Sequence, residues 1–198
     1  MRTLYRRIRY GEPIVVVSGL PRSGTSMAMQ MLAAGGHPVV TDGIREADQD
    51  NPKGYYEEER VKDLHLNGVD RCWVRGTRGK AIKIISFLLK YLPKDNNYKI
   101  IFMRRDLGEV LASQTKMLER RGEPNETSDE EMLSIWQNHL WRVNYLLKHA
   151  PHMEAIEIVY SDAIGDPMRE VTRIRDFLGR ELKLDRMAGI VDPSLHRN

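Results

Sequence analysis

The fold of this chain is decided by the stretch Ile14-Val15-Val16-Val17-Ser18-Gly19-Leu20-Pro21-Arg22-Ser23-Gly24-Thr25-Ser26. Its first four residues are apolar and β-branched, which predicts a strand buried on both faces, as in a parallel sheet. A helical pattern follows from Gly24 to about Ala34, and two glycines end it. A buried strand that passes through a glycine-containing loop into a helix is typical of α/β proteins that bind phosphate groups.

The rest of the chain repeats this alternation of strand and helix. Further strands are predicted at 81–85, 98–103 and 155–160. Helix starts are predicted by three capping signals: Asp106 with Glu109, Ser128 with Glu131, and Asp166 with Pro167. The order of elements indicates an α/β fold with three layers, in which helices flank both faces of a parallel sheet.

The composition indicates a folded protein, since 41% of the residues are hydrophobic and 30% are charged. A chain of 198 residues suits one domain. No internal repeat or linker divides the chain, so we expect a single domain over residues 1–198. Cys72 is the single cysteine, which excludes an intramolecular disulfide and favours a reducing, cytoplasmic location.

The charge and hydropathy patterns exclude two classes of partner. The 31 basic residues exceed the 28 acidic ones by only three, and much of the excess lies in a basic arm over the first ten residues. A nucleic-acid-binding protein has a broader basic face. No apolar run approaches the roughly 20 residues that a membrane span needs. We therefore expect neither nucleic acid nor membrane as a partner.

The loop after the first strand has the chemistry of an anion site. Gly19 and Gly24 give it the G-x-x-x-x-G frame that lets backbone N–H groups point inward. The following helix adds the positive end of its dipole. Arg22 supplies a cation, and hydroxyl groups come from Ser23, Thr25 and Ser26.

The same loop departs from that of the nucleoside triphosphatases. Thr25 stands where their lysine belongs, and the third strand ends in Arg104-Arg105 rather than in a metal-binding aspartate. The sequence therefore predicts an anion bound without a metal. A nucleotide kinase or triphosphatase with a degenerate loop is the alternative within this class.

Residues 21–26, Pro-Arg-Ser-Gly-Thr-Ser, resemble the 5′-phosphosulfate loop of the sulfotransferases, whose pattern is P-[KR]-[ST]-G-T-[TS]. Arg105 and, eight residues later, Ser113 are similar to the pair that binds the 3′-phosphate in that family. The resemblance implies a P-loop-like sulfotransferase fold. It also implies 3′-phosphoadenosine 5′-phosphosulfate (PAPS) as co-substrate, no metal, and transfer of a sulfonate group to a hydroxyl or amine of a small-molecule acceptor.

Two further matches carry less information. Tyr160, in Tyr160-Ser161-Asp162, resembles the family's tyrosine that approaches the adenine, but it also fits a core aromatic residue. The tail from Asp192 to Arg197 resembles the tails of small bacterial-type members. The resemblance suggests that Arg197 replaces the 3′-phosphate contacts of the longer C-terminal segment found in animal cytosolic enzymes.

The resemblance also suggests catalytic residues. Arg22 stands where the family has a cation near the leaving phosphate. Lys83 resembles the strand lysine that meets the sulfonate, although a solvated lysine at a sheet edge is the other reading. No histidine follows that lysine, so the base of the animal cytosolic enzymes is missing, which keeps a non-catalytic nucleotide-binding protein as an alternative.

Residues 51–59 resemble an Asn-Pro-x-Gly-aromatic-aromatic-Glu segment that supplies a glutamate base in other branches of the family. Glu57 is therefore our choice as the general base. The other candidates are Glu58, Glu46, Asp42 and His65. The acceptor and the oligomeric state, a homodimer included, stay open.

Overall fold

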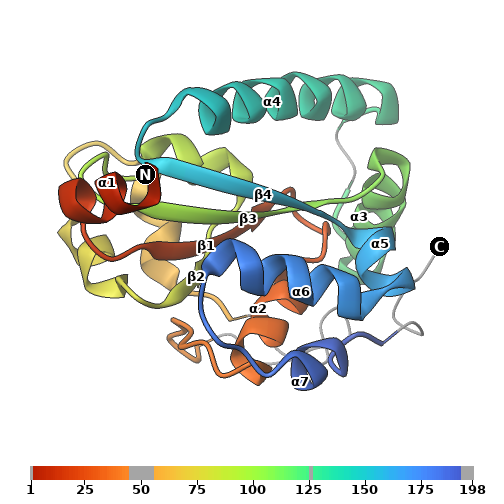
Figure 1. Ribbon diagram of the computed structural model, residues 1–198. Coiled ribbons are helices and arrows are strands. Elements are labelled where there is room, and N and C mark those ends of the chain that lie inside the picture. The colour runs from red at the N-terminus through yellow and green to blue at the C-terminus, as the bar shows by residue number, and fades with distance from the viewer. Residues whose placement is uncertain (1, 45–55, 125–126, 193–198) are drawn as a thin grey trace.

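The computed structural model describes residues 2–44, 56–124 and 127–192. Its centre is a sheet of four parallel strands in the order β2-β1-β3-β4. The strands are β1 (Ile14–Gly19), β2 (Ala81–Lys83), β3 (Tyr98–Arg104) and β4 (Met153–Val159). The predicted α/β fold is confirmed, and β3 and β4 end on the side of the sheet where α3 and α5 begin (Figure 1).

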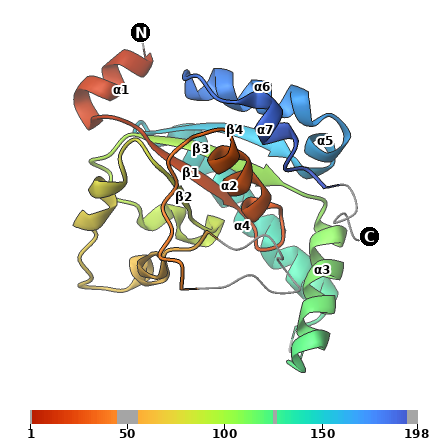
Figure 2. The same cartoon turned by 90° about the horizontal axis from the view of Figure 1, so that it is seen from below.

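Helices cover both faces of the sheet, which makes three layers (Figures 1 and 2). The α-helices are α1 (Arg2–Tyr10), α2 (Thr25–Ala34), α3 (Leu107–Arg121), α4 (Asp129–His149), α5 (Tyr160–Gly165), α6 (Pro167–Leu178) and α7 (Leu184–Ala188). Three short 3₁₀-helices add to them, η1 (Glu59–His65), η2 (Cys72–Thr77) and η3 (Ser86–Tyr91). Within these described ranges, no helix combines the length and the apolar character needed to cross a membrane.

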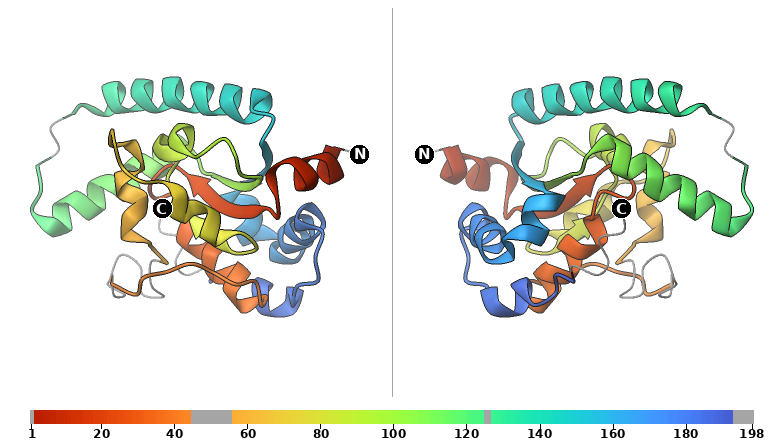
Figure 3. Two further views of the ribbon diagram at one scale, coloured as in Figure 1. Left: turned by 90° about the vertical axis from the view of Figure 1, so that its left-hand side faces the viewer. Right: turned by 90° about the vertical axis from the view of Figure 1, so that its right-hand side faces the viewer.

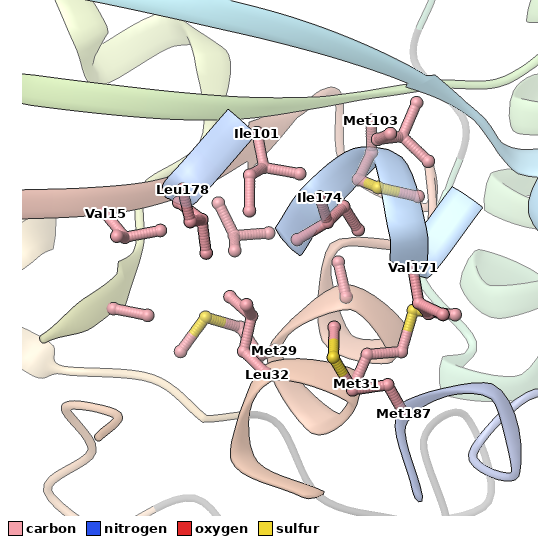
Figure 4. Packing of buried hydrophobic residues seen from close by; sticks show 14 of the residues in the cluster. Val15, Met29, Met31, Leu32, Ile101, Met103, Val171, Ile174, Leu178 and Met187 are labelled. Carbon is pink, nitrogen blue, oxygen red and sulfur yellow. The ribbon is translucent and has the colours of Figure 1, made fainter. Parts of the chain in front are cut away.

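Side chains along β1 point alternately to the two faces of the sheet, so the hydrophobic core has two parts. Val15 and Val17 face the layer of α2, α6 and α7, where they pack with buried methionine, leucine and isoleucine side chains (Figure 4). Ile14 and Val16 face the opposite layer, which contains α4 and the 3₁₀-helices. All six residues of β1 are buried, as expected for a strand flanked by β2 and β3 and covered on both faces.

The predicted capping residues begin the helices as expected. The side chains of Asp106, Ser128 and Asp166 accept hydrogen bonds from the backbone N–H three residues further on, at 3.1, 3.3 and 3.1 Å. Glu109 departs from the capping-box pattern, since its carboxylate pairs with Arg105 at 2.8 Å. The start of α3 is thereby fixed next to a residue of the predicted anion site.

The structure corrects three local predictions. The basic arm is the helix α1, and Arg6 anchors it by donating to the carbonyl groups of Pro151 and Met153 and pairing with Glu154. The sequence also predicts a helix from Glu57 to about Leu66, and the structure has the 3₁₀-helix η1 there, from Glu59 to His65. The fourth strand ends at Val159, so Tyr160 is the first residue of α5.

Gly19 is required at the point where β1 turns into the loop. Its φ is +154°, and a Cβ atom there would lie 2.7 Å from the Met103 carbonyl oxygen and 2.4 Å from Ser23 Oγ. We expect Gly19→Ala to lower the free energy of unfolding by about 2–4 kcal/mol through overpacking and backbone strain. Urea denaturation measures this. Gly76→Ala is the control, because its Cβ would meet nothing within 4 Å; equal losses in the two variants would contradict the assignment.

Candidate functional site

The loop between β1 and α2 is a tight turn closed by its own backbone. The Leu20 carbonyl oxygen accepts from the Ser23 N–H at 3.2 Å and from Ser23 Oγ at 2.7 Å. Gly24, with φ +96°, is the N-cap of α2. A glycine offers no side chain to cap the first turn, so this end of α2 retains amide groups suited to an anion. The Ser23 hydroxyl, which we expect to bind the anion, donates to the Leu20 carbonyl oxygen and so closes the loop.

Arg22 has a backbone conformation that is rare for a residue with a side chain. Its φ is +67°, in the left-handed region. Such conformations cost free energy and persist where the surroundings hold them. Here the Arg22 side chain donates from Nε to Ser113 Oγ at 3.0 Å, and the Arg22 carbonyl oxygen accepts from Arg105 at 3.2 Å.

These two bonds join the loop after β1 to the segment after β3. Arg105 lies between β3 and α3, and Ser113 lies on α3 itself. The Arg105 side chain is only 8% exposed and pairs with Glu109 at 2.8 Å. The structure thus brings together Arg22, Arg105 and Ser113, which the sequence placed in two separate motifs.

Tyr160, directly after β4, lies beside Arg105 and the loop after β1. The Arg105 guanidinium carbon lies 4.4 Å from the centre of its ring. A Cβ atom on Gly24 would lie 2.6 Å from Tyr160 Cδ2, so the ring packs directly on the loop. Burial raises the pKa of the Tyr160 hydroxyl, and Arg105 opposes the shift. Tyr160 therefore fits both interpretations: it is a buried aromatic residue, and its ring packs against the loop.

Lys83 and Glu57 form an ion pair at the end of β2. Lys83 Nζ lies 2.8 Å from Glu57 Oε1, and the two side chains are 8% and 19% exposed. Lys83 pairs in register with Val17, just before the loop. The interpretation of Lys83 as a solvated charge is wrong, since its side chain is buried. Its partner is Glu57, which the sequence independently suggests as the general base.

Two of the other acidic candidates for the base, Asp42 and Glu58, are engaged in local structure. Asp42 accepts from the N–H groups of Ile44 and Glu59, which lower the pKa of its carboxyl. Glu58 is held by the Arg60 guanidinium through both carboxylate oxygens, and this pairing lowers the pKa of Glu58. Both carboxylates are thereby bound to backbone N–H groups or to a neighbouring guanidinium, whereas Glu57 is bound to Lys83 on β2.

Three predictions remain to be placed. His65 is exposed, and its Nδ1 lies 2.7 Å from the Lys62 carbonyl oxygen. Glu46 and Arg197 lie outside the described residues. Among the residues that the structure does describe, no group of three or more His, Cys, Asp or Glu side chains could hold a metal ion.

A histidine that sequence reasoning missed stands beside the end of β2. His139 Nε2, from α4, lies 2.8 Å from Ser86 Oγ, and its ring stacks on Phe87 at 3.8 Å. Burial, with Lys90 and Arg142 nearby, lowers the pKa of His139. Helical spacing could have predicted that His139 points inward, because it falls on the same face of α4 as the buried Trp136 and Val143.

The comparisons with known proteins agree with this geometry. The model of the Sulfotransferase family matches residues 72–184, more than half of the chain. This range contains Lys83, Arg105, Ser113, His139 and Tyr160. A search of curated proteins found no significant match.

Solved structures share the fold at low sequence identity. Mouse sulfotransferase SULT7A1, complexed with PAP, is 19% identical with a TM-score of 0.59; the match covers 91% of this chain and 63% of the mouse chain. A sulfotransferase domain from the curacin biosynthetic pathway is 15% identical with a TM-score of 0.53, covering 93% and 89%.

Retinol dehydratase, in complex with androsterone and PAP, is 16% identical with a TM-score of 0.51, covering 99% of this chain and 68% of that one. At such identities the structural likeness establishes the fold alone. The family model adds the relationship in sequence, and together with the fold it shows that this chain belongs to the sulfotransferase family.

Proposed function

We propose that this protein is a PAPS-dependent sulfotransferase that transfers a sulfonate group to a hydroxyl or amine of a small molecule. The observation that carries the proposal is the junction of Arg22, Ser113 and Arg105 at the loop after β1. Two cations and the start of α2 meet there, and the residue types match both nucleotide motifs of the family.

The residues present fit a ligand with two separate anionic groups. Arg22 and the amide groups at the start of α2 suit the 5′-phosphosulfate. Arg105 and Ser113 suit the 3′-phosphate, because a guanidinium makes charge-assisted hydrogen bonds to phosphate oxygens. Tyr160 offers an aromatic face beside them. The PAP bound in the crystals of mouse SULT7A1 and retinol dehydratase supports this choice of ligand.

The reaction makes two demands on the chain. A bond forms between the acceptor atom and sulfur while the bond from sulfur to the 5′-phosphate oxygen breaks. The acceptor gives up a proton, which we assign to the Glu57 carboxylate as general base. The phosphate oxygen gains negative charge, which Arg22 and Lys83 stabilise as fixed cations. Arg22 acts through charge alone, since a guanidinium does not readily release a proton.

The Glu57–Lys83 ion pair suits this division of roles. The Lys83 ammonium donates a hydrogen bond to the Glu57 carboxylate and so holds it in one position at the end of β2. The acceptor is of a small-molecule class, as androsterone in the retinol dehydratase crystal suggests. Its identity depends on the lining of the pocket and does not follow from the fold.

The first prediction concerns the 3′-phosphate. PAP, the product that remains when PAPS loses its sulfonate group, should stabilise the protein against heat more than ADP does. The reason is that PAP carries a 3′-phosphate, which Arg105 and Ser113 can bind, and ADP does not. At 100 times the dissociation constant, a ligand contributes about 2.7 kcal/mol. Arg105→Ala should remove the preference, whereas Arg104→Ala should keep it, because Arg104 bonds Glu157 and Asn144 instead. Equal thermal shifts with PAP and ADP in the wild type would refute the assignment.

The second prediction concerns metal. PAP binding and sulfonate transfer should both survive EDTA, because Thr25 replaces the lysine of metal-dependent loops and β3 ends in arginine. Thermal shifts with PAP, ATP and GTP, each with and without Mg²⁺, measure this. A response to ATP that needs Mg²⁺ would favour the kinase or triphosphatase.

The third prediction concerns the base. Once an acceptor is found among phenols, sugars and amines, Glu57→Gln should lower the turnover rate by roughly 10²–10⁴. Its PAP affinity should barely change, since the substitution is nearly isosteric. Glu59→Gln is the matched control, because Glu59 belongs to the same acidic run but pairs with Lys62. Arg22→Ala should lower both affinity and rate.

Other results would assign the role of general base to a different residue. Normal turnover in Glu57→Gln together with loss in His139→Gln would assign the proton to His139. Loss in Glu58→Gln or Glu46→Gln alone would assign it to that carboxylate. PAP binding without turnover of any acceptor would favour the non-catalytic nucleotide-binding protein.

The fourth prediction concerns His139 and pH. Burial lowers the pKa of His139, so the folded state disfavours its protonation. The stability that the neutral ring provides is present above pH 6.5, the usual pKa of histidine, and is lost as the pH falls below it. The wild type should therefore lose more unfolding free energy between pH 7 and pH 5 than His139→Gln. Parallel pH profiles for the two proteins would contradict the prediction.

A further inference from the structure

The outer face of α4 carries a regular seam of exposed side chains. Helix α4 lies along the top of the molecule, with no described element beyond it in any view (Figures 1 and 3). Its inner face buries Trp136 and Val143. The seam consists of Glu131, Ser134, Asn138, Trp141, Tyr145 and Lys148, all exposed and spaced alternately three and four residues apart. This spacing is that of helices that pack side by side.

Large exposed apolar side chains are more concentrated on α4 than on any other described element. Trp141 and Tyr145 are 68% and 58% exposed. They stack on each other at 6.1 Å, and Tyr145 stacks on His149 at 4.1 Å. Ile135, on the same helix, is 46% exposed. Outside α4, large exposed hydrophobic residues stand on α1, α6 and single loops, at most two to an element.

The two halves of the seam are complementary to each other in size and charge. The first half carries the acidic Glu131 and the small polar Ser134 and Asn138. The second half carries the aromatic Trp141 and Tyr145 and the basic Lys148. When two such helices run antiparallel about a two-fold axis, Trp141 faces Asn138, Tyr145 faces Ser134, and Lys148 faces Glu131.

We propose that this seam is the contact between two copies of the chain, which pair through α4 in antiparallel orientation. A two-fold axis makes the interface self-complementary, so every favourable pair occurs twice. The aromatic residues are of the kind that anchors interfaces. Antiparallel pairing also brings the negative end of each helix dipole toward the positive end of the other.

The size of the seam sets the strength of the dimer. A helix of 21 residues is about 30 Å long. An interface of one helix on each side is at the small end of specific interfaces. We therefore expect a reversible dimer with a dissociation constant on the order of 10 µM.

Sedimentation velocity of the full chain between about 1 and 100 µM tests the proposal, over a range centred on the expected dissociation constant. The wild type should shift from monomer to dimer across this range. Trp141→Ala and Tyr145→Ala should each weaken the dimer at least about tenfold. Met168→Ala is the matched control, because Met168 is an exposed apolar residue on α6, away from the seam. A wild type that stays monomeric, or a dimer that Trp141→Ala leaves intact, would overturn the proposal.

Charge reversal tests the antiparallel register. Glu131→Lys and Lys148→Glu should each weaken the dimer, because like charges then face each other twice. The double variant should restore it. Circular dichroism confirms that each variant is folded. A double variant that dimerises no better than the single ones would overturn the antiparallel pairing. The readout needs neither PAPS nor an acceptor, so it is independent of the proposed function.

Discussion

The backbone of one residue, Arg22, holds the site together. Its left-handed conformation turns the side chain toward Ser113 and the carbonyl oxygen toward Arg105. The loop after β1 and the segment after β3 are thereby joined by the chain's own hydrogen bonds. Such a junction forms only when β1 and β3 are parallel neighbours, since their carboxyl ends then meet at one edge of the sheet. The strand order and the glycines of the loop serve this arrangement.

Much of this could be predicted because the signals are local. A run of β-branched residues, a capping aspartate and a glycine frame each specify conformation within a few residues, so β1, the start of α3 and the loop were predicted correctly. The Glu57–Lys83 pair and the Ser86–His139 contact were not, because they join residues 26 and 53 positions apart. The hydrogen bond from the Ser23 hydroxyl to the Leu20 carbonyl oxygen was not predicted either, because it depends on how the loop folds back on itself.

The charges at the site are nearly balanced, and this bears on the proposed binding of an anion. Arg105 pairs with Glu109, and Lys83 pairs with Glu57, so two of the cations are already compensated. Buried ion pairs of this kind position side chains more than they add stability. In the proposed function, a 3′-phosphate would compete with Glu109 for the Arg105 guanidinium, which would favour ligands with concentrated negative charge over weaker anions.

Helix α4 has an inner face that contacts the rest of the chain and an outer face that we propose pairs with a second copy. Its inner face presents Trp136 to the core beside Leu20 of the loop and His139 to Ser86. Its outer face carries the aromatic seam. If a second copy shifts α4, Trp136 and His139 shift with it relative to Leu20 and Ser86, and a molecule bound against these residues would shift the seam in turn. Thermodynamic linkage makes the two effects equal in size, so self-association and ligand binding would each report on the other.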